Sequence, residues 1–382
     1  MSMAKRSKGL GIGAHGRRVN SDVVGRRSVR SVDRAATNAP EAIRQPAWAL
    51  PLFVAVNAGC NLRCGYCTVF GENKTHPRGG LSVPRLLQLL ETAYRLGVRK
   101  FRFTGGEPTL HGALGEILRA TQALGDDVRI AMTTNGARLG ALVDVFPRLI
   151  SPQVFVSVDA VGRPADAAVD EGGLRIDKWL TPELIDVIRA VRPAAHVRLN
   201  YVLTASNADQ LPALIEYAIG DHLDVKIFEL LLRDFHYAGD RPPLEVFREQ
   251  YVPVRTLLPR LRERFGEPEP FGGLGGRGIP MYAFHAGASK IVYFDSLVGS
   301  HYGDACADCP LFPCQEGLYS LVLDASGTLH PAGCINTRLH RRLAVASPAE
   351  ADAAFRELAQ AIREARFTPV LPDHLATHEL VI

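Results

Sequence analysis

CNLRCGYC, at residues 60–67, has the most specific spacing in this chain, because Cys60, Cys64 and Cys67 form a C-x3-C-x2-C pattern. Three thiolates on one short loop can bind three irons of a cubane cluster and leave the fourth iron open. A structural zinc site normally closes its tetrahedron with a fourth Cys or His, and His76 is nine residues further on. The spacing therefore favours an iron–sulfur cluster whose open iron can be chelated by a small molecule with amino and carboxylate groups.

The loop directly follows the first of six short apolar runs, which alternate with amphipathic stretches of helical length. The runs are 52–57, 98–104, 128–133, 153–159, 195–202 and 223–230, and the helical patterns are 84–96, 112–124, 139–146, 181–191 and 207–219. Strands separated by helices predict βαβ units and a parallel sheet. We predict an α/β fold, an open, partial (β/α)6 TIM-like barrel, with its site at the C-terminal ends of the strands. A doubly wound open sheet is the alternative.

Four more cysteines lie toward the C-terminus, at Cys306, Cys309, Cys314 and Cys334. Four thiolates can hold a fully ligated [4Fe–4S] cluster or a structural zinc ion, and the spacing alone does not decide between them. The company of the first cysteine loop favours an auxiliary iron–sulfur cluster. The region also contains a predicted hairpin, with a strand at 318–324 and a turn at 325–327.

The glycine-rich segment 272–278, after a helical pattern at 243–264, predicts a boundary between a barrel and a small cysteine-rich module. A last amphipathic helix is predicted at 348–365. The predicted parts are a disordered basic tail, the barrel, the auxiliary-cluster module, and a C-terminal helix and tail, at 1–48, 49–270, 271–345 and 346–382 respectively.

Charge is distributed unevenly along the chain. The net charge is +4, but the first 50 residues carry ten Lys or Arg against three Asp or Glu, which is +7 and leaves −3 for the remainder. The main part of the chain thus gives no reason to expect a nucleic-acid partner. No apolar run is long enough to span a membrane and no secretory signal is visible, so we expect a cytoplasmic protein. In that compartment, seven cysteines are expected to be metal ligands rather than disulfides.

With the aromatic Tyr66 before its third cysteine, the loop resembles the signature of the radical S-adenosylmethionine (AdoMet) superfamily. The resemblance implies a [4Fe–4S] cluster on Cys60, Cys64 and Cys67 that cleaves AdoMet to a 5′-deoxyadenosyl radical, which abstracts a hydrogen from the substrate. A motif that ends the second strand, Gly105-Gly106-Glu107-Pro108, resembles the superfamily's AdoMet amino-group motif. The residues that the resemblance places around AdoMet are Tyr66, Gly105, Gly106, Glu107, Ser157, Asn200 and Leu231. For Ser157 and Asn200, the alternative is an ordinary polar residue satisfied at a strand end.

Over about residues 50–340 the chain most closely resembles the GTP 3′,8-cyclase group of molybdenum cofactor biosynthesis. The matching stretches are CNLRCGYC, VRKFRFTGGEPTL, MTTNG, FVSVDAV, VRLNYVLTASNADQ and VKIFELL. That group has a second, three-cysteine cluster after its barrel. Cys309, Cys314 and Cys334 match its ligand places, with Cys306 as an extra thiolate.

Cationic side chains recur on the predicted strands, at Lys100, Arg102, Arg198 and Lys226. Alternation places Lys100 and Arg102 on one face of their strand, and a parallel strand covered on both faces leaves such charges in need of partners. They suggest an anionic substrate group, such as a phosphate or a carboxylate. The alternative is pairing with internal carboxylates, namely Asp159, Glu107 or Glu229. The resemblance favours substrate contacts at all four cations and at Thr133.

Three departures from the cyclase group argue against GTP cyclisation. Phe53 stands where the group has an arginine, residues 315–318 lack its Arg-x-Arg run, and residues 380–382 do not form its terminal Gly-Gly. We therefore expect a paralogue in specialised metabolism that acts on a nucleotide, nucleoside or sugar acid and takes electrons from a reductase, flavodoxin or ferredoxin. The alternatives are a peptide-modifying maturase, the GTP 3′,8-cyclase itself, and a non-enzymatic binding protein stabilised by zinc or a cluster. No residue is assigned as the catalytic acid, base or hydrogen donor.

Overall fold

A computed structural model describes residues 50–62, 64, 66–67, 80–162, 178–231, 243–271, 281–295, 300–301, 320–331, 342–364 and 368–369. The predicted basic tail, the glycine-rich segment and the four C-terminal cysteines lie outside the described residues. The tail, the domain boundaries and the auxiliary-cluster ligands therefore stay predictions.

All six predicted strands form and lie side by side in the order in which they occur along the chain. They are β1 (Leu52–Ala55), β2 (Lys100–Thr104), β3 (Arg129–Thr134), β4 (Gln153–Ser157), β7 (His196–Leu203) and β8 (Asp224–Glu229). Each pair of neighbours is parallel. The predicted parallel α/β sheet is confirmed. A doubly wound sheet reverses its strand order partway, and these six strands do not.

The sheet extends beyond these six strands on both sides. β13 (Leu321–Leu323) pairs parallel with β1, and β11 (Ser289–Tyr293) pairs parallel with β8. Antiparallel strands complete each side, namely β14 (Thr328–Pro331) and β15 (Leu343–Ala344) beyond β13, and β10 (Met281–Ala286) and β9 (Glu269–Phe271) beyond β11. The order ends at β15 and β9, and among the described residues no pairing joins these two strands, so the sheet is open.

The predicted hairpin at 318–324 is the pair β13 and β14. Its turn contains Gly327 in the left-handed region, at φ +83°, and the Asp324 side chain accepts hydrogen bonds from the backbone N–H groups of Ser326 and Thr328. Two short sheets stand apart from the main one. They are β5 (Ala160–Val161) with β6 (Trp179–Leu180), and β12 (Ser300–His301) with β16 (Thr368–Pro369).

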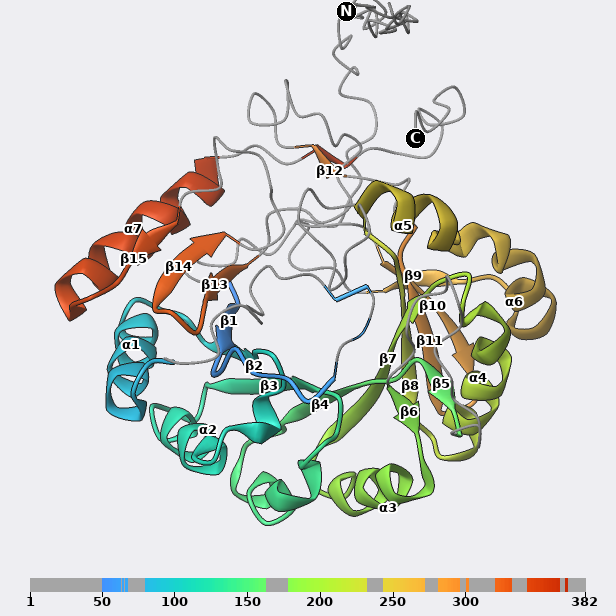
Figure 1. The fold of residues 1–382 in the computed structure, drawn as a ribbon, viewed down its shortest axis with the longest axis horizontal. Helices are drawn as coiled ribbons and strands as arrows, with labels where there is room; N and C mark the ends of the chain where they lie inside the picture. Colours follow the sequence, from blue (N-terminus) through green and yellow to red (C-terminus); the bar gives the residue numbers. More distant parts are fainter. Residues whose placement is uncertain are drawn as a thin grey trace, which may run out of the picture. The chain divides into compact units, whose positions relative to one another are not determined.

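Helices follow the strands and lie along the outer face of the curved sheet (Figure 1). The predicted ones that form are α1 (Val83–Arg95), α2 (Leu114–Gln122), α3 (Pro182–Val191), α4 (Leu211–Gly220) and α7 (Pro348–Glu364). Among the described residues, none is both long enough and apolar enough to cross a lipid bilayer. A short 3-10 turn, η2 (Pro108–Leu110), precedes α2, and another, η5 (Ala208–Gln210), precedes α4.

Two predicted helices were wrong in extent. Within residues 139–146 the helices are short 3-10 turns, η3 (Leu139–Leu142) and the first residue of η4 (Phe146–Arg148), and Gly140 lowers the helix propensity of this stretch. The stretch 243–264 divides into α5 (Pro243–Gln250), η6 (Val254–Thr256) and α6 (Leu258–Phe265). Pro253, which has no N–H to donate to a helical hydrogen bond, lies at this break.

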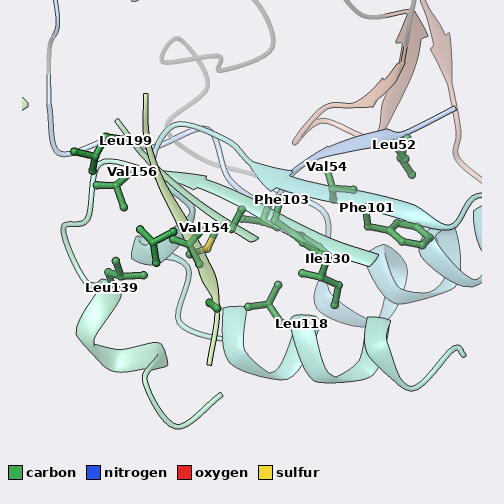
Figure 2. Packing of buried hydrophobic residues seen from close by; sticks show 14 of the residues in the cluster. Leu52, Val54, Phe101, Phe103, Leu118, Ile130, Leu139, Val154, Val156 and Leu199 are labelled. Atoms are coloured by element: carbon green, nitrogen blue, oxygen red, sulfur yellow. The ribbon is translucent and has the colours of Figure 1, made fainter. Parts of the chain in front are cut away.

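The main hydrophobic core lies between the sheet and these helices, and alternation along each strand decides which residues enter it. Phe101 and Phe103 of β2 pack there with Ile130 and with Leu118 of α2 (Figure 2). Full burial of such side chains stabilises the fold by roughly 1.5–3 kcal/mol each. The intervening positions, Arg102 among them, therefore face the inner side of the sheet. That inner side is where a site can form.

Candidate active site

The cysteine loop leaves the C-terminal end of β1. Cys64 is buried, Cys60 and Cys67 are half-buried, and all three are free thiols. The Cys67 backbone N–H donates to the Cys64 carbonyl at 3.1 Å, and the Leu62 N–H donates to Cys60 Sγ at 3.4 Å. Across the described ranges, no three His, Cys, Asp or Glu side chains are arranged around a single metal ion. A cubane places each thiolate on a different iron, so this donor set fits a cluster without converging on one ion.

Gly105 and Gly106 bring the end of β2 against the segment that precedes Cys60. The Gly106 N–H donates to the Asn57 carbonyl at 3.0 Å, and the Glu107 N–H donates to the Gly59 carbonyl at 2.8 Å. A Cβ at Gly106 would lie 2.2 Å from the Gly59 carbonyl oxygen, and one at Gly105, where φ is +144°, 2.5 Å from the Asn57 oxygen. No side chain fits in that space. The two glycines thus hold the cysteine loop in addition to their predicted AdoMet role.

The Glu107 carboxylate joins the ends of β2 and β3. It is buried and accepts hydrogen bonds from the Thr109 N–H and hydroxyl, from the Thr134 hydroxyl, and from the Asn135 N–H at 2.6 Å. Its backbone carbonyl accepts from Asn57 Nδ2 at 2.9 Å. The hydrogen-bond partners of the Glu107 carboxylate are therefore groups of the protein itself. Thr109, Thr134 and Asn135 were not predicted as site residues, although the MTTNG stretch was a signal for the last two.

Tyr66 connects the cysteine loop to the segments that follow β4 and precede β6. Its hydroxyl donates to Asp159, which follows β4, and accepts from Lys178 Nζ at 2.9 Å. The ammonium also lies 4.7 Å from the centroid of the Tyr66 ring. Burial, followed by the negative charge of Asp159, raises the pKa of Tyr66 well above its ordinary value, so the phenol stays protonated. The sequence contained no signal for Lys178, which comes to this place through the short β5–β6 pair.

The remaining predicted AdoMet positions also lie at C-terminal strand ends. Ser157 of β4 is directly opposite Asn200 of β7, and Leu231 follows β8. Asn200 is buried, and its side-chain oxygen accepts from Arg198 Nε at 3.2 Å. The structure therefore brings these positions to the same end of the sheet as the cysteine loop. Their contacts with AdoMet stay predictions.

Three of the four predicted cations, Arg102, Arg198 and Lys226, form what we term the cationic cluster. Arg198 is opposite Phe155, two residues before the Ser157–Asn200 pair, which places it about 7 Å further from the strand ends. The Arg198 guanidinium carbon lies 4.1 Å from the Phe155 ring centroid, and that of Arg102 lies 4.9 Å from the same ring. The cluster is thus assembled from three strands, and two of its cations share an aromatic ring that attracts cations.

Further aromatic and polar groups contact the cationic cluster. Arg102 also lies 4.9 Å from the Phe53 ring centroid, and its Nε donates to the Thr133 hydroxyl at 2.9 Å. Lys226 Nζ lies 4.6 Å from the Phe228 ring centroid and 3.1 Å from the Met281 sulfur. A thioether is only a weak acceptor for an ammonium group.

The cluster is strongly electropositive. Burial, followed by the charges of Arg198 and Arg102, lowers the pKa of Lys226 well below its ordinary value. Burial, followed by the charge of Arg102, lowers the pKa of Arg198 to about 9, while Asp224 acts in the opposite direction. Within the described part of the chain, no ion pair includes Arg198 or Lys226. Such charges favour an anionic ligand.

The internal carboxylates weighed as alternative partners contact other groups. Glu107 accepts from the donors described above, and Asp159 accepts from Tyr66. Glu229 accepts from the Val254 N–H and the Tyr251 hydroxyl. Lys100, the fourth predicted cation, is exposed at the start of β2, and its charge is not among those that shift the pKa of Arg198 or Lys226.

Comparison with known proteins identifies the domain that holds the cysteine loop. Residues 54–206 match the family model described as the radical SAM superfamily. The GTP 3′,8-cyclase of Chlorobaculum tepidum is 28% identical over 246 residues, which cover 63% of this chain and 69% of the relative. The GTP 3′,8-cyclase of Pelotomaculum thermopropionicum is 27% identical over 319 residues, covering 82% and 89%. A probable GTP 3′,8-cyclase of Methanocella arvoryzae is 32% identical over 214 residues, covering 56% and 64%.

Solved structures give weaker matches. Streptococcus suis SuiB is 17% identical with a TM-score of 0.48, and the match covers 76% of this chain and 61% of that one. Native anSMEcpe with bound AdoMet is 16% identical with a TM-score of 0.46, covering 81% and 80%. The sequence matches confirm the predicted resemblance: residues 54–206 match the radical SAM superfamily, and the chain is similar to enzymes of the GTP 3′,8-cyclase group. The family implies a [4Fe–4S] cluster and AdoMet as cofactors, and a reductant.

Proposed function

We propose that this radical SAM enzyme abstracts a hydrogen from a small anionic substrate whose charged group is bound by the cationic cluster. The observation that carries the proposal is the meeting of Arg102, Arg198 and Lys226 on the inner face, beside the predicted AdoMet position Asn200. Each of these cations contacts an aromatic ring, and no ion pair of the described residues includes Arg198 or Lys226. A phosphate or carboxylate would supply the missing negative charge.

The cofactor positions follow from the cysteine loop. Cys60, Cys64 and Cys67 would hold the [4Fe–4S] cluster, with AdoMet beside the glycine motif and the Ser157–Asn200 pair. With AdoMet bound and the cluster reduced, this pair of cofactors supplies the 5′-deoxyadenosyl radical that removes the substrate hydrogen. The four C-terminal cysteines would hold a second cluster, as the spacing from Cys306 to Cys334 suggests.

The chain's own residues orient the substrate in this scheme. Arg198 and Lys226 bind its anionic group, and Arg102, supported by Thr133, completes the site from β2. Because Arg198 donates to the Asn200 side chain and Lys226 is opposite Asn200 on the next strand, an anion bound by the cationic cluster lies beside the predicted AdoMet positions. The aromatic rings around the cations reduce the access of water and strengthen the charge interactions.

Phe53 supports a substrate different from GTP. In the resemblance, the cyclase group has an arginine at this position on the first strand. Here the Phe53 ring packs against the Arg102 guanidinium at 4.9 Å, so β1 contributes an apolar surface in place of a cation. A smaller anionic charge, as in a monophosphate nucleotide or a sugar acid, suits this inner face better than a triphosphate.

Anaerobic reconstitution tests the proposal. The parent should bind about eight irons, and a Cys60→Ala/Cys64→Ala/Cys67→Ala variant about four. After reduction with dithionite or a flavodoxin system, only the parent should convert AdoMet to 5′-deoxyadenosine. Candidate nucleotides and sugar acids should then accelerate 5′-deoxyadenosine formation in the parent.

A matched control separates the two halves of the proposal. Arg198→Gln should keep the iron content and the slow, substrate-independent cleavage of AdoMet, but should lose the acceleration by an anionic substrate. Zinc in place of iron, or no AdoMet cleavage by the parent, would exclude the radical mechanism in this chain. An acceleration that survives Arg198→Gln would exclude the cationic cluster as the substrate site.

A further inference from the structure

The Cys60 sulfur accepts hydrogen bonds from two N–H groups. One is the backbone N–H of Leu62, at 3.4 Å, within the cysteine loop itself. The other comes from a different strand, because Asn135 Nδ2, just after β3, lies 3.8 Å from Cys60 Sγ. Sulfur is a large acceptor, and N–H···S contacts are longer than N–H···O hydrogen bonds. The second contact thus connects the predicted cluster ligand, on the loop after β1, to the end of β3, two strands away.

The orientation of the Asn135 amide is determined by its other partners. Its side-chain oxygen accepts from the Ala137 N–H at 2.9 Å, so the amide nitrogen must point the other way, toward Cys60. Its backbone N–H is held by the Glu107 carboxylate at 2.6 Å. The amide nitrogen also donates to the Asn61 side-chain oxygen at 3.0 Å. Asn135 is therefore held in place by Glu107, which follows β2, and by Asn61 of the cysteine loop.

A donor aimed at a ligating sulfur affects the electron affinity of a cluster. Reduction adds negative charge that is shared with the thiolates, and an N–H dipole pointing at the sulfur stabilises that charge. Hydrogen bonds to the sulfurs are among the features that set the reduction potentials of iron–sulfur clusters. Removal of such a donor makes the cluster harder to reduce.

We propose that Asn135 is a positioning residue that raises the reduction potential of the cluster on Cys60, Cys64 and Cys67 by donating to the Cys60 sulfur. This inference rests on the proposed function, because it requires that the cysteine loop holds the cluster. It assigns to the MTTNG stretch a part in the electron-transfer step, separate from the Thr133 hydroxyl on the substrate side.

A redox titration followed by electron paramagnetic resonance, without AdoMet or substrate, tests the role. The full-length, reconstituted parent is compared with Asn135→Ala and Asn135→Asp, and Asn61→Ala is the control. Asn135→Ala should shift the reduction equilibrium about ten-fold toward the oxidised cluster, which is about 59 mV for one electron. Asn135→Asp keeps an acceptor for the Ala137 N–H and adds a negative charge, so its shift should be larger in the same direction.

Asn61→Ala removes a contact of Asn135 but leaves its donation to Cys60, so its potential should equal that of the parent. Equal potentials in Asn135→Ala and the parent would overturn the inference, as would an equal shift in Asn61→Ala. If Asn135→Ala fails to retain iron, the comparison of Asn135→Asp with Asn61→Ala decides the matter. A parent without the cysteine-loop cluster would instead refute the proposed function.

Discussion

The cysteine-loop end of the inner face and the cationic cluster use polar groups in opposite ways. At the loop end, Glu107, Asn57 and Asn135 are hydrogen-bonded to one another or to neighbouring backbone. In the cationic cluster, Arg198 and Lys226 face aromatic rings, and burial lowers the pKa of both. The first region thus maintains its own geometry. The second holds charge at an energetic cost that a bound anion would relieve.

The largest expected effect comes from Gly106→Ala, at the cysteine-loop end of the inner face. The new Cβ would lie 2.2 Å from the Gly59 backbone oxygen, so either the loop or the end of β2 must move. We expect the variant to lose most of the cysteine-loop iron and to be destabilised by roughly 1–3 kcal/mol. Iron analysis and thermal melting measure both. Gly112→Ala, which meets nothing within 4 Å, is the matched control and should retain full iron content.

The second effect concerns anion binding by the cationic cluster. Arg198→Ala removes a charged donor, and hydrogen bonds to charged groups are worth roughly 1.5–3 kcal/mol. We therefore expect pyrophosphate, as a simple anionic probe, to bind about 10- to 150-fold more weakly in isothermal titration calorimetry. Cluster content should not change, because Arg198 contacts none of the cysteines. Unchanged pyrophosphate affinity would mean that the two regions do not differ in the way described above.

The third prediction concerns pH and uses Lys226→Met. In the unfolded chain this amine stays protonated up to about pH 10.4. In the folded chain its lowered pKa releases the proton earlier, so between the two pKa values the unfolded state binds more protons and stability rises with pH. The rise is at most about 1.4 kcal/mol per pH unit for one proton. The cost of the buried charge is fully present below the folded pKa.

Lys226→Met removes the titrating amine, and the Met side chain is similar in length to that of Lys. Its unfolding free energy should therefore rise less steeply between neutral pH and pH 10 than that of the parent, and it should be the more stable protein at the lower end of that range. Urea denaturation at a series of pH values measures the difference. Parallel profiles for the two proteins would show that Lys226 is not desolvated.

The contrast between the two regions also explains how much of the molecule could be predicted from its sequence. The six central strands and the cysteine loop were predictable because short-range periodicity and spacing specify them. β9, β10 and β11 were not predicted, because their place in the sheet depends on pairing with β8, far away in the sequence. Lys178 was missed for a similar reason, since only the fold brings it to Tyr66.

The three residues of the cationic cluster were predicted, but the prediction also included Lys100, which does not belong to it. Alternation correctly placed Lys100 and Arg102 on one face of β2, but it cannot say how deep each position lies. Burial depends on how neighbouring strands and loops cover the sheet. Arg102 is half-buried between two aromatic rings, whereas Lys100 is exposed at the strand's first residue.

The smallest expected effect is that of Lys100→Ala. Its comparison with Arg102→Ala tests whether burial, which alternation does not predict, separates the two side chains. Lys100 is exposed, so its removal should change stability by less than about 0.5 kcal/mol. Solvent and salt screen its charge from the cationic cluster, so pyrophosphate affinity should change by less than about two-fold. Arg102→Ala should weaken pyrophosphate binding far more, because its charge acts on both Arg198 and Lys226. A comparable loss in Lys100→Ala would extend the anion site to the start of β2 and restore the four-cation site predicted from the sequence.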